Sequence, residues 1–294
     1  MLGKLPPRLG IVILLVVASC FAANHLSARI AFDHGASVAA AVAVRATSTA
    51  LFLFFLLKIL KVPFGLPAGT RGPALIAGVL IAVQSYTLYS AVAIIPPALA
   101  LLVFQTSPML YVLLTWAFGK QKPQAAALAP MLLALVGLAL ALDIRTDQLG
   151  QRWSEIGAGV SWAFASGVSM AFVYFLNTNA LAALDGRLRT FVMTAVTATI
   201  VIVAAGSAGA MRFPADATGA AGLVSLTIFY CTAMIGLFAV LPRVPPAATA
   251  ALNFEPIALL GLAWIFLDQR ASALQIVGAF ITVGAIAWLS AMKR

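Results

Sequence analysis

PIALLGLAWIFLDQ, residues 256–269, resembles a stretch that lies 148 residues earlier, PMLYVLLTWAFGKQ, residues 108–121. Five of the fourteen aligned positions are identical, including the first proline and the central tryptophan. Upstream, Pro96-Pro97-Ala98 corresponds to Pro245-Pro246-Ala247 after a one-residue gap. An internal repeat of this kind predicts two equivalent halves, which we place at residues 1–144 and 145–294.

The composition of the chain is that of an integral membrane protein. Hydrophobic residues make up 63% of it and charged residues only 9%, and its mean hydropathy is +1.06. About a quarter of the residues of a soluble domain are charged. We therefore expect an all-α integral membrane protein, because its apolar runs are continuous, whereas the strands of a barrel alternate apolar and polar residues.

Apolar runs of about twenty residues, each long enough to cross a bilayer as a helix, recur along the whole chain. The ten predicted transmembrane helices lie at 10–30, 36–57, 73–94, 97–118, 124–142, 155–176, 189–206, 219–241, 246–267 and 272–290. We expect the first to be retained as a helix, since its apolar run is longer than the core of a typical signal peptide.

The formal charge of +10 does not indicate nucleic acid, because the charges are arranged about the spans. If the N-terminus is cytoplasmic, twelve Lys and Arg residues fall inside and five outside, and Arg45 alone lies within a span. This distribution follows the positive-inside rule and predicts a multi-pass protein with cytoplasmic N- and C-termini.

An odd number of spans in each half inverts the second half relative to the first. The loop after the fourth span carries Lys120 and Lys122, as a cytoplasmic loop should, whereas the equivalent loop carries Asp268 and Arg270. The fold class expected is therefore ten transmembrane helices in two inverted five-helix repeats. Such repeats are typical of secondary transporters that work by alternating access.

Several short motifs resemble the drug/metabolite transporter superfamily, EamA type. They are Phe21-Ala22-Ala23-Asn24, Arg45, LLALVGLAL at 132–140, Asn253-Phe254-Glu255-Pro256 and Phe266-Leu267-Asp268. The overall pattern is most similar to YddG-like amino-acid exporters. The first half departs from it, with Gln105 and Lys120 where a related carboxylate is expected.

The resemblance implies an exporter of small organic solutes in a bacterial inner membrane, with amino acids, including aromatic ones, or related metabolites as cargo. A drug or nucleotide-derived metabolite transporter of the same fold is the alternative, followed by a membrane enzyme or an assembly subunit. The expected partners are a small-molecule substrate and the lipid bilayer, with no nucleic acid and no cofactor. The two histidines and two cysteines give no metal pattern, and we expect no enzymatic activity.

Polar side chains are concentrated in some of the spans, and the resemblance implies that these spans line a central cavity. The candidate cavity residues are Asn24, His25, Gln84, Tyr86, Tyr89, Gln105, Trp162, Ser166, Tyr230, Asn253 and Glu255. A hydrogen bond between helices is an equally good interpretation of each of them.

Glu255 raises the sharpest question, because burying a charge within a membrane is costly unless a partner or water meets it. Its role is open between a structural pair or hinge, binding of a substrate amine or proton, and solvation in a wet cavity. Arg45 is the cation predicted at a similar depth, and His25 is either a packing residue or a proton site. Pro108 and Pro256 are candidate structural or gating residues, since proline interrupts a helix.

Overall fold

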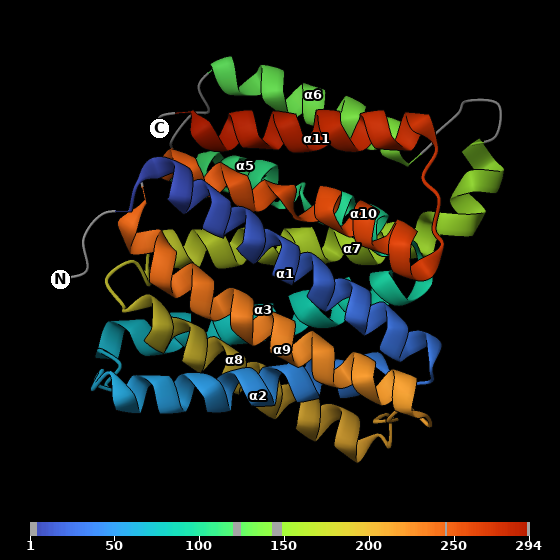
Figure 1. Ribbon diagram of the computed structural model, residues 1–294. Coiled ribbons are helices and arrows are strands. Elements are labelled where there is room, and N and C mark those ends of the chain that lie inside the picture. Colours follow the sequence, from blue (N-terminus) through green and yellow to red (C-terminus); the bar gives the residue numbers. More distant parts are fainter. Residues whose placement is uncertain (1–4, 120–124, 143–148, 245, 293–294) are drawn as a thin grey trace.

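The structure is a computed structural model, and it describes residues 5–119, 125–142, 149–244 and 246–292. Within these ranges all regular structure is helical (Figure 1). The elements are α1 (Pro7–Asp33), α2 (Val38–Ile59), α3 (Ala68–Ile94), α4 (Pro97–Phe104), α5 (Ser107–Gly119), α6 (Ala125–Ala141), α7 (Leu149–Thr178), α8 (Gly186–Ser207), α9 (Ala217–Val240), the 3-10 helices η1 (Leu241–Arg243) and η2 (Pro246–Phe254), α10 (Glu255–Leu267) and α11 (Ala273–Ala291).

Each predicted span coincides with one of these helices, except that the fourth comprises α4 and α5 and the ninth comprises η2 and α10. By length and composition, eight helical segments of the described residues can cross a membrane. The apolar parts of α6 and α11 are shorter, at Ala126–Ala141 and Ala273–Leu289. The fold is therefore a bundle of apolar helices, and the count of ten spans stays a prediction.

The boundaries of several helices repeat with the 148-residue spacing found in the sequence. α2 and α8 are both 22 residues long, and their first residues are 148 positions apart. α5 and α10 are both 13 residues long with the same separation. The N-caps of α2 and α8, Ser37 and Asp185, are also equivalent, and each side chain accepts backbone N–H bonds at its helix start.

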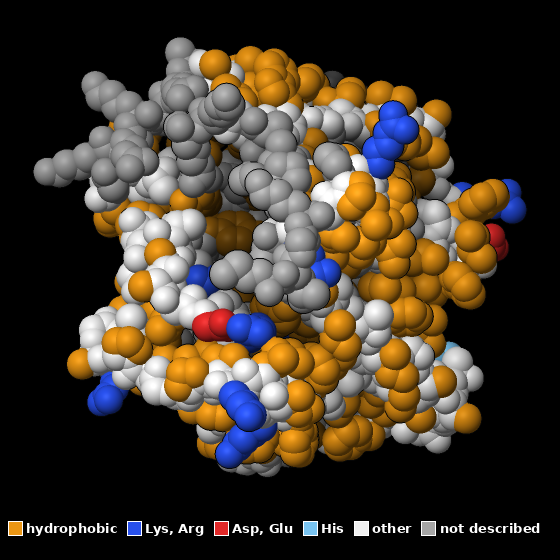
Figure 2. Space-filling model, turned by 60° about the vertical axis from the view of Figure 1, so that its left-hand side comes forward, with side chains coloured by type: hydrophobic (Ala, Val, Ile, Leu, Met, Phe, Trp, Pro, Cys, Tyr) orange, Lys and Arg blue, Asp and Glu red, His pale blue; other side chains and the backbone are white. Residues whose placement is uncertain are grey.

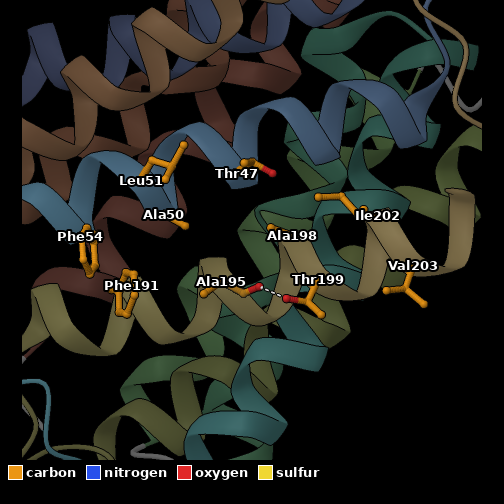
Figure 3. A pocket seen from close by; sticks show the side chains of 10 residues that line it. All are labelled: Thr47, Ala50, Leu51, Phe54, Phe191, Ala195, Ala198, Thr199, Ile202 and Val203. Carbon is orange, nitrogen blue, oxygen red and sulfur yellow. Dashed lines mark hydrogen bonds between the residues drawn. The ribbon is translucent and has the colours of Figure 1, made fainter.

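Equivalent helices lie side by side and run antiparallel. Phe54, late in α2, contacts Phe191, early in α8, with ring centroids 6.3 Å apart, and Figure 3 follows the two helices from there to Thr47 and Ile202. In the other pair, Thr282 Oγ1 of α11 donates to the carbonyl of Ala134 in α6 at 3.5 Å. These arrangements are what an inverted repeat predicts.

The two predicted halves are interleaved. α1 packs along α9, and α7 packs along α3. The predicted boundary at residue 144 lies outside the described residues. Figure 1 shows that α1 begins and α11 ends on the same side of the molecule, as an even number of crossings requires.

Glycine allows α6 and α11 to approach each other closely. A Cβ atom added to Gly278 would lie 2.6 Å from the carbonyl oxygen of Gly137, and one added to Gly137 would lie 2.6 Å from the backbone nitrogen of Thr282. Both distances are too short for carbon against a backbone atom. Small residues at a helix contact are how membrane helices gain van der Waals packing.

Outside the predicted spans, an acidic cap fixes the start of α9. Asp216 accepts from the Gly219 N–H at 2.8 Å and lies 2.6 Å from His34 Nδ1. The Gly219 hydrogen bond and then the His34 hydrogen bond hold the pKa of Asp216 below its usual value. This contact joins the start of α9 to the end of α1.

Candidate functional site

Two spans of the bundle are interrupted, at places 148 residues apart. In the first, α4 ends at Phe104 and α5 begins at Ser107; in the second, η2 ends at Phe254 and α10 begins at Glu255. Pro108 and Pro256 each occupy the second position of the new α-helix. The missing N–H of proline is tolerated at this position, but the proline ring prevents the α-helix from extending back into the preceding turn. Discontinuous helices at corresponding positions are a feature of transporter binding sites.

One hydrogen bond spans the two interruptions. Gln105 Nε2 donates to Asn253 Oδ1 at 3.5 Å, and these residues are 148 positions apart. α4 also packs against α10. The interruptions therefore lie next to each other, and both predicted site residues lie there.

Glu255 is the first residue of α10. The predicted span 246–267 placed it inside one helix, but α10 begins at Glu255 itself, and Pro256 belongs to the first turn of α10. Its Oε1 atom lies 3.3 Å from His25 Nε2, and the exposed fractions of the two side chains are 23% for Glu255 and 8% for His25. A helix N-terminus favours a carboxylate, so the position stabilises the charge.

Arg45 has different partners from the one expected. It forms no ion pair with Glu255; its Nη2 atom donates to Ser85 Oγ at 2.6 Å. The guanidinium carbon lies 4.9 Å from the ring centroid of Tyr89 and 4.5 Å from that of Tyr230. The hypothesis of an Arg45–Glu255 pair is therefore wrong for this conformation, and His25 is the partner of Glu255.

Tyr89 lies between the two charged groups. Its ring contacts Arg45 and also lies edge-on to the His25 ring, with the centroids 5.8 Å apart. Its hydroxyl donates to Asn24 Oδ1 at 3.1 Å, and Asn24 Nδ2 donates to the Leu226 carbonyl at 2.7 Å. Three predicted residues, Asn24, His25 and Tyr89, are thus held in one network.

A second network anchors Arg45 to α3 and α7. Ser85 Oγ donates to Gln84 Oε1 at 3.2 Å, and Gln84 Nε2 donates to Ser166 Oγ at 3.2 Å. Ser166 Oγ in turn donates to the Gln84 carbonyl at 3.0 Å. Ser85 was not among the predicted site residues, and nothing in its sequence context distinguishes it from the other small polar residues.

Tyr86 and Trp162 do not join these networks. Tyr86 is 43% exposed and lines a groove with residues of α3 and α8, because successive residues of a helix point about 100° apart and Tyr86 follows Ser85. Trp162 is exposed on α7. The charged cluster is therefore defined as Arg45, Ser85, Tyr89, Tyr230, His25 and Glu255, and Phe21 packs edge-on against Tyr230.

The face at which α1 begins and α11 ends is hollowed near its middle, and hydrophobic side chains are visible inside the hollow (Figure 2). Within the described ranges, no group of three or more His, Cys, Asp or Glu side chains could hold a metal ion. The charged cluster offers a ligand one guanidinium, one carboxylate and aromatic surfaces.

Comparison with known proteins gives a family match for part of the chain. Residues 8–142 match the EamA-like transporter family. Twenty-seven chains of solved structures match. One, titled "Crystal structure of protein", has a TM-score of 0.65 and 17% sequence identity and covers 97% of this chain and 98% of its own. That identity is informative about the fold alone.

No curated protein matches the chain. The family match suggests a membrane transporter of small solutes rather than an enzyme, embedded in the bilayer through its apolar helices.

Proposed function

We propose that the chain is a secondary transporter that exports amino acids, including aromatic ones, or related metabolites across a bacterial inner membrane by alternating access. The observation that carries this proposal is the charged cluster, which brings Arg45 and the His25–Glu255 pair to the ring of Tyr89. A buried cation and a partly exposed carboxylate suit the two ends of a zwitterion. The rings of Tyr89 and Tyr230 offer flat surfaces to an apolar side chain.

The proposed mechanism rests on the internal repeat. Two inverted halves, residues 1–144 and 145–294, would expose one site alternately to each side of the membrane. The recurrence of helix boundaries at one shift, the antiparallel contact of α2 with α8 and the paired interruptions support this interpretation.

The alternative cargoes differ in how well they suit the charged cluster. A cationic drug would place a second positive charge beside Arg45, which has no acidic partner in the described residues. An anionic, nucleotide-derived metabolite would be compatible with Arg45 and is the second candidate.

Transport of amino acids is testable with the purified full chain. In proteoliposomes, we expect exchange of labelled phenylalanine or tyrosine, measured with and without a proton gradient. Expression in bacteria is expected to raise resistance to toxic amino-acid analogues, because an exporter lowers their internal concentration. Unchanged resistance together with no exchange of any amino acid would favour the nucleotide-derived cargo.

The proposed orientation also gives an expected labelling pattern. A single cysteine at position 122, outside the described residues, is expected to react only from the cytoplasm, and one at position 270, after α10, only from the outside. Cys20 and Cys231 are to be replaced first in both proteins. Reaction of both positions from the same side would contradict the inverted repeat.

A further inference from the structure

Arg45 is a buried cation whose hydrogen-bonding capacity is mostly unused. Only 8% of the residue is exposed. A guanidinium has five N–H donors. The single hydrogen bond that Arg45 side-chain atoms donate in the described structure goes from Nη2 to Ser85, and Nε is enclosed without a partner. A charge buried in this way is costly unless a further group meets it.

No carboxylate of the described residues performs that role. Glu255 is held by His25, and no Asp or Glu of the described ranges lies within 4.0 Å of the Arg45 guanidinium. The buried cation is also not repeated in the second half of the sequence. The residue equivalent to Arg45 under the 148-residue shift is Met193 in α8, which is buried and apolar.

The two tyrosine rings that pack against Arg45 differ in how firmly they are held. Tyr89 is buried, and its hydroxyl is fixed by Asn24. Tyr230 is only half-buried, and its hydroxyl has no hydrogen bond in the part of the chain that the structure describes. The Tyr89 ring is therefore a fixed surface, and the Tyr230 side of Arg45 is the less enclosed of the two.

We infer that Arg45 binds the carboxylate of the transported solute, whose apolar body lies against Tyr89 and Tyr230. The unused N–H groups of a guanidinium match the two oxygens of a carboxylate in a bidentate pair. Ser85 is a positioning residue, because it orients the guanidinium through Nη2. The inference rests on the proposed function and narrows its substrates to organic carboxylates.

A carboxylate suits the charged cluster better than a phosphate does. Phosphate monoesters carry between one and two negative charges at neutral pH, whereas Arg45 supplies one positive charge and Glu255 adds a negative one nearby. Among the residues of the charged cluster, Arg45 is the permanent cation. A monoanionic group therefore balances the charge of Arg45 without a further proton.

The test is competition against labelled phenylalanine in proteoliposomes of the full-length protein. The unlabelled competitors are phenylalanine, 3-phenylpropionate, which lacks the amine, phenylalaninamide and phenethylamine, which lack the carboxylate, and phenyl phosphate. We expect the two carboxylates to compete, and the amide and amine to need about ten- to hundredfold higher concentrations, the range for loss of a charge-assisted hydrogen bond. Equal competition by phenylalaninamide, or stronger competition by phenyl phosphate than by 3-phenylpropionate, would overturn the inference.

Substitutions test whether the preference for carboxylates depends on Arg45. Arg45→Met, which copies the residue at the equivalent position 193, is expected to remove the preference for phenylalanine over its amide, and Arg45→Lys to retain part of it. Arg71→Met is the control, because Arg71 is exposed at the start of α3 and its Nε donates to the Leu66 carbonyl. An unchanged preference in folded Arg45→Met protein would contradict the inference, and the wild-type competition decides the matter if that variant does not fold.

A second readout separates this inference from the proposed function. The same probes are added to detergent-purified protein, and the melting temperature is measured. If carboxylates alone raise it, and only when Arg45 is present, the inference stands even without phenylalanine exchange, and the proposed cargo is wrong. If phenylalanine is exchanged but its amide competes equally, the proposed function stands and the inference fails; if no probe binds, both fail.

Discussion

Substitution of Gly278 by alanine is expected to destabilise the protein by about 1–3 kcal/mol, the usual cost of forcing an extra carbon into a packed interior. The added Cβ would be 2.6 Å from the Gly137 carbonyl oxygen, and this neighbour is backbone that no rotamer change can move. α6 and α11 would have to separate along their contact. Gly278→Val is expected to cost more and to reduce the folded yield.

The same helix provides the control. Gly284 of α11 has no atom within 4 Å of an added Cβ, so Gly284→Ala is expected to leave stability unchanged or raise it slightly through helix propensity. Both variants are compared with the wild type by thermal unfolding of the purified protein. Equal melting temperatures for the two would mean that α6 and α11 adjust without loss of packing.

Substitution of Glu255 by glutamine is expected to leave the protein folded but to lower transport about tenfold or more, the effect of removing a charged hydrogen-bonding group. Glu255 is partly exposed at a helix N-terminus, where a carboxylate contributes only about 0.3–1 kcal/mol to stability. If the carboxylate exchanges protons with His25 during transport, the variant also loses its response to a proton gradient. Transport is measured as initial exchange rates in proteoliposomes.

A matched control lies at the other end of α10. Asp268→Asn also neutralises a carboxylate, but the side chain of Asp268 is 88% exposed, and asparagine tolerates its left-handed backbone conformation. We expect it to transport at the wild-type rate. A fully active Glu255→Gln protein would exclude both substrate and proton binding at Glu255.

Double-mutant cycles identify the partner of Glu255. Glutamine substitutions at His25 and Glu255 are expected to be coupled by about 0.5–3 kcal/mol in unfolding free energy, as contacting residues usually are. Glutamine substitutions at Arg45 and Glu255 are expected to be coupled more weakly than that, since no ion pair joins them and they are connected only through His25 and Tyr89. The reverse result would restore the Arg45–Glu255 pair.

The positions of the helices were predictable from the sequence, whereas the directions in which their side chains point were not. Every predicted span coincides with helix because membrane helices are apolar over their whole length. The same property removes the polar stripe that would indicate which side faces inward. This is why Tyr86 and Trp162 were grouped with Gln84 and Ser166, although only the latter two join the inner network.

Which side chains meet across the bundle depends on how the helices pack, and this packing cannot be predicted from a single sequence. Arg45 and Glu255 were matched by their similar depth, but depth does not fix the direction of a side chain around the helix axis. His25 lies on α1 and reaches Glu255 because α10 packs against α1. The 3-10 geometry before Glu255 also went unpredicted, because Pro256 is compatible with either a kink or a helix start.

The proposed inverted repeat has a consequence for the origin of the charged cluster. Under the 148-residue shift, Arg45 corresponds to Met193, His25 to Val173 and Glu255 to Ser107. A dimer built from two copies of the first half would contain two arginines and no glutamate at these positions, and one built from the second half would contain the opposite. If gene duplication produced this chain, its two copies have since diverged at the positions of the charged cluster.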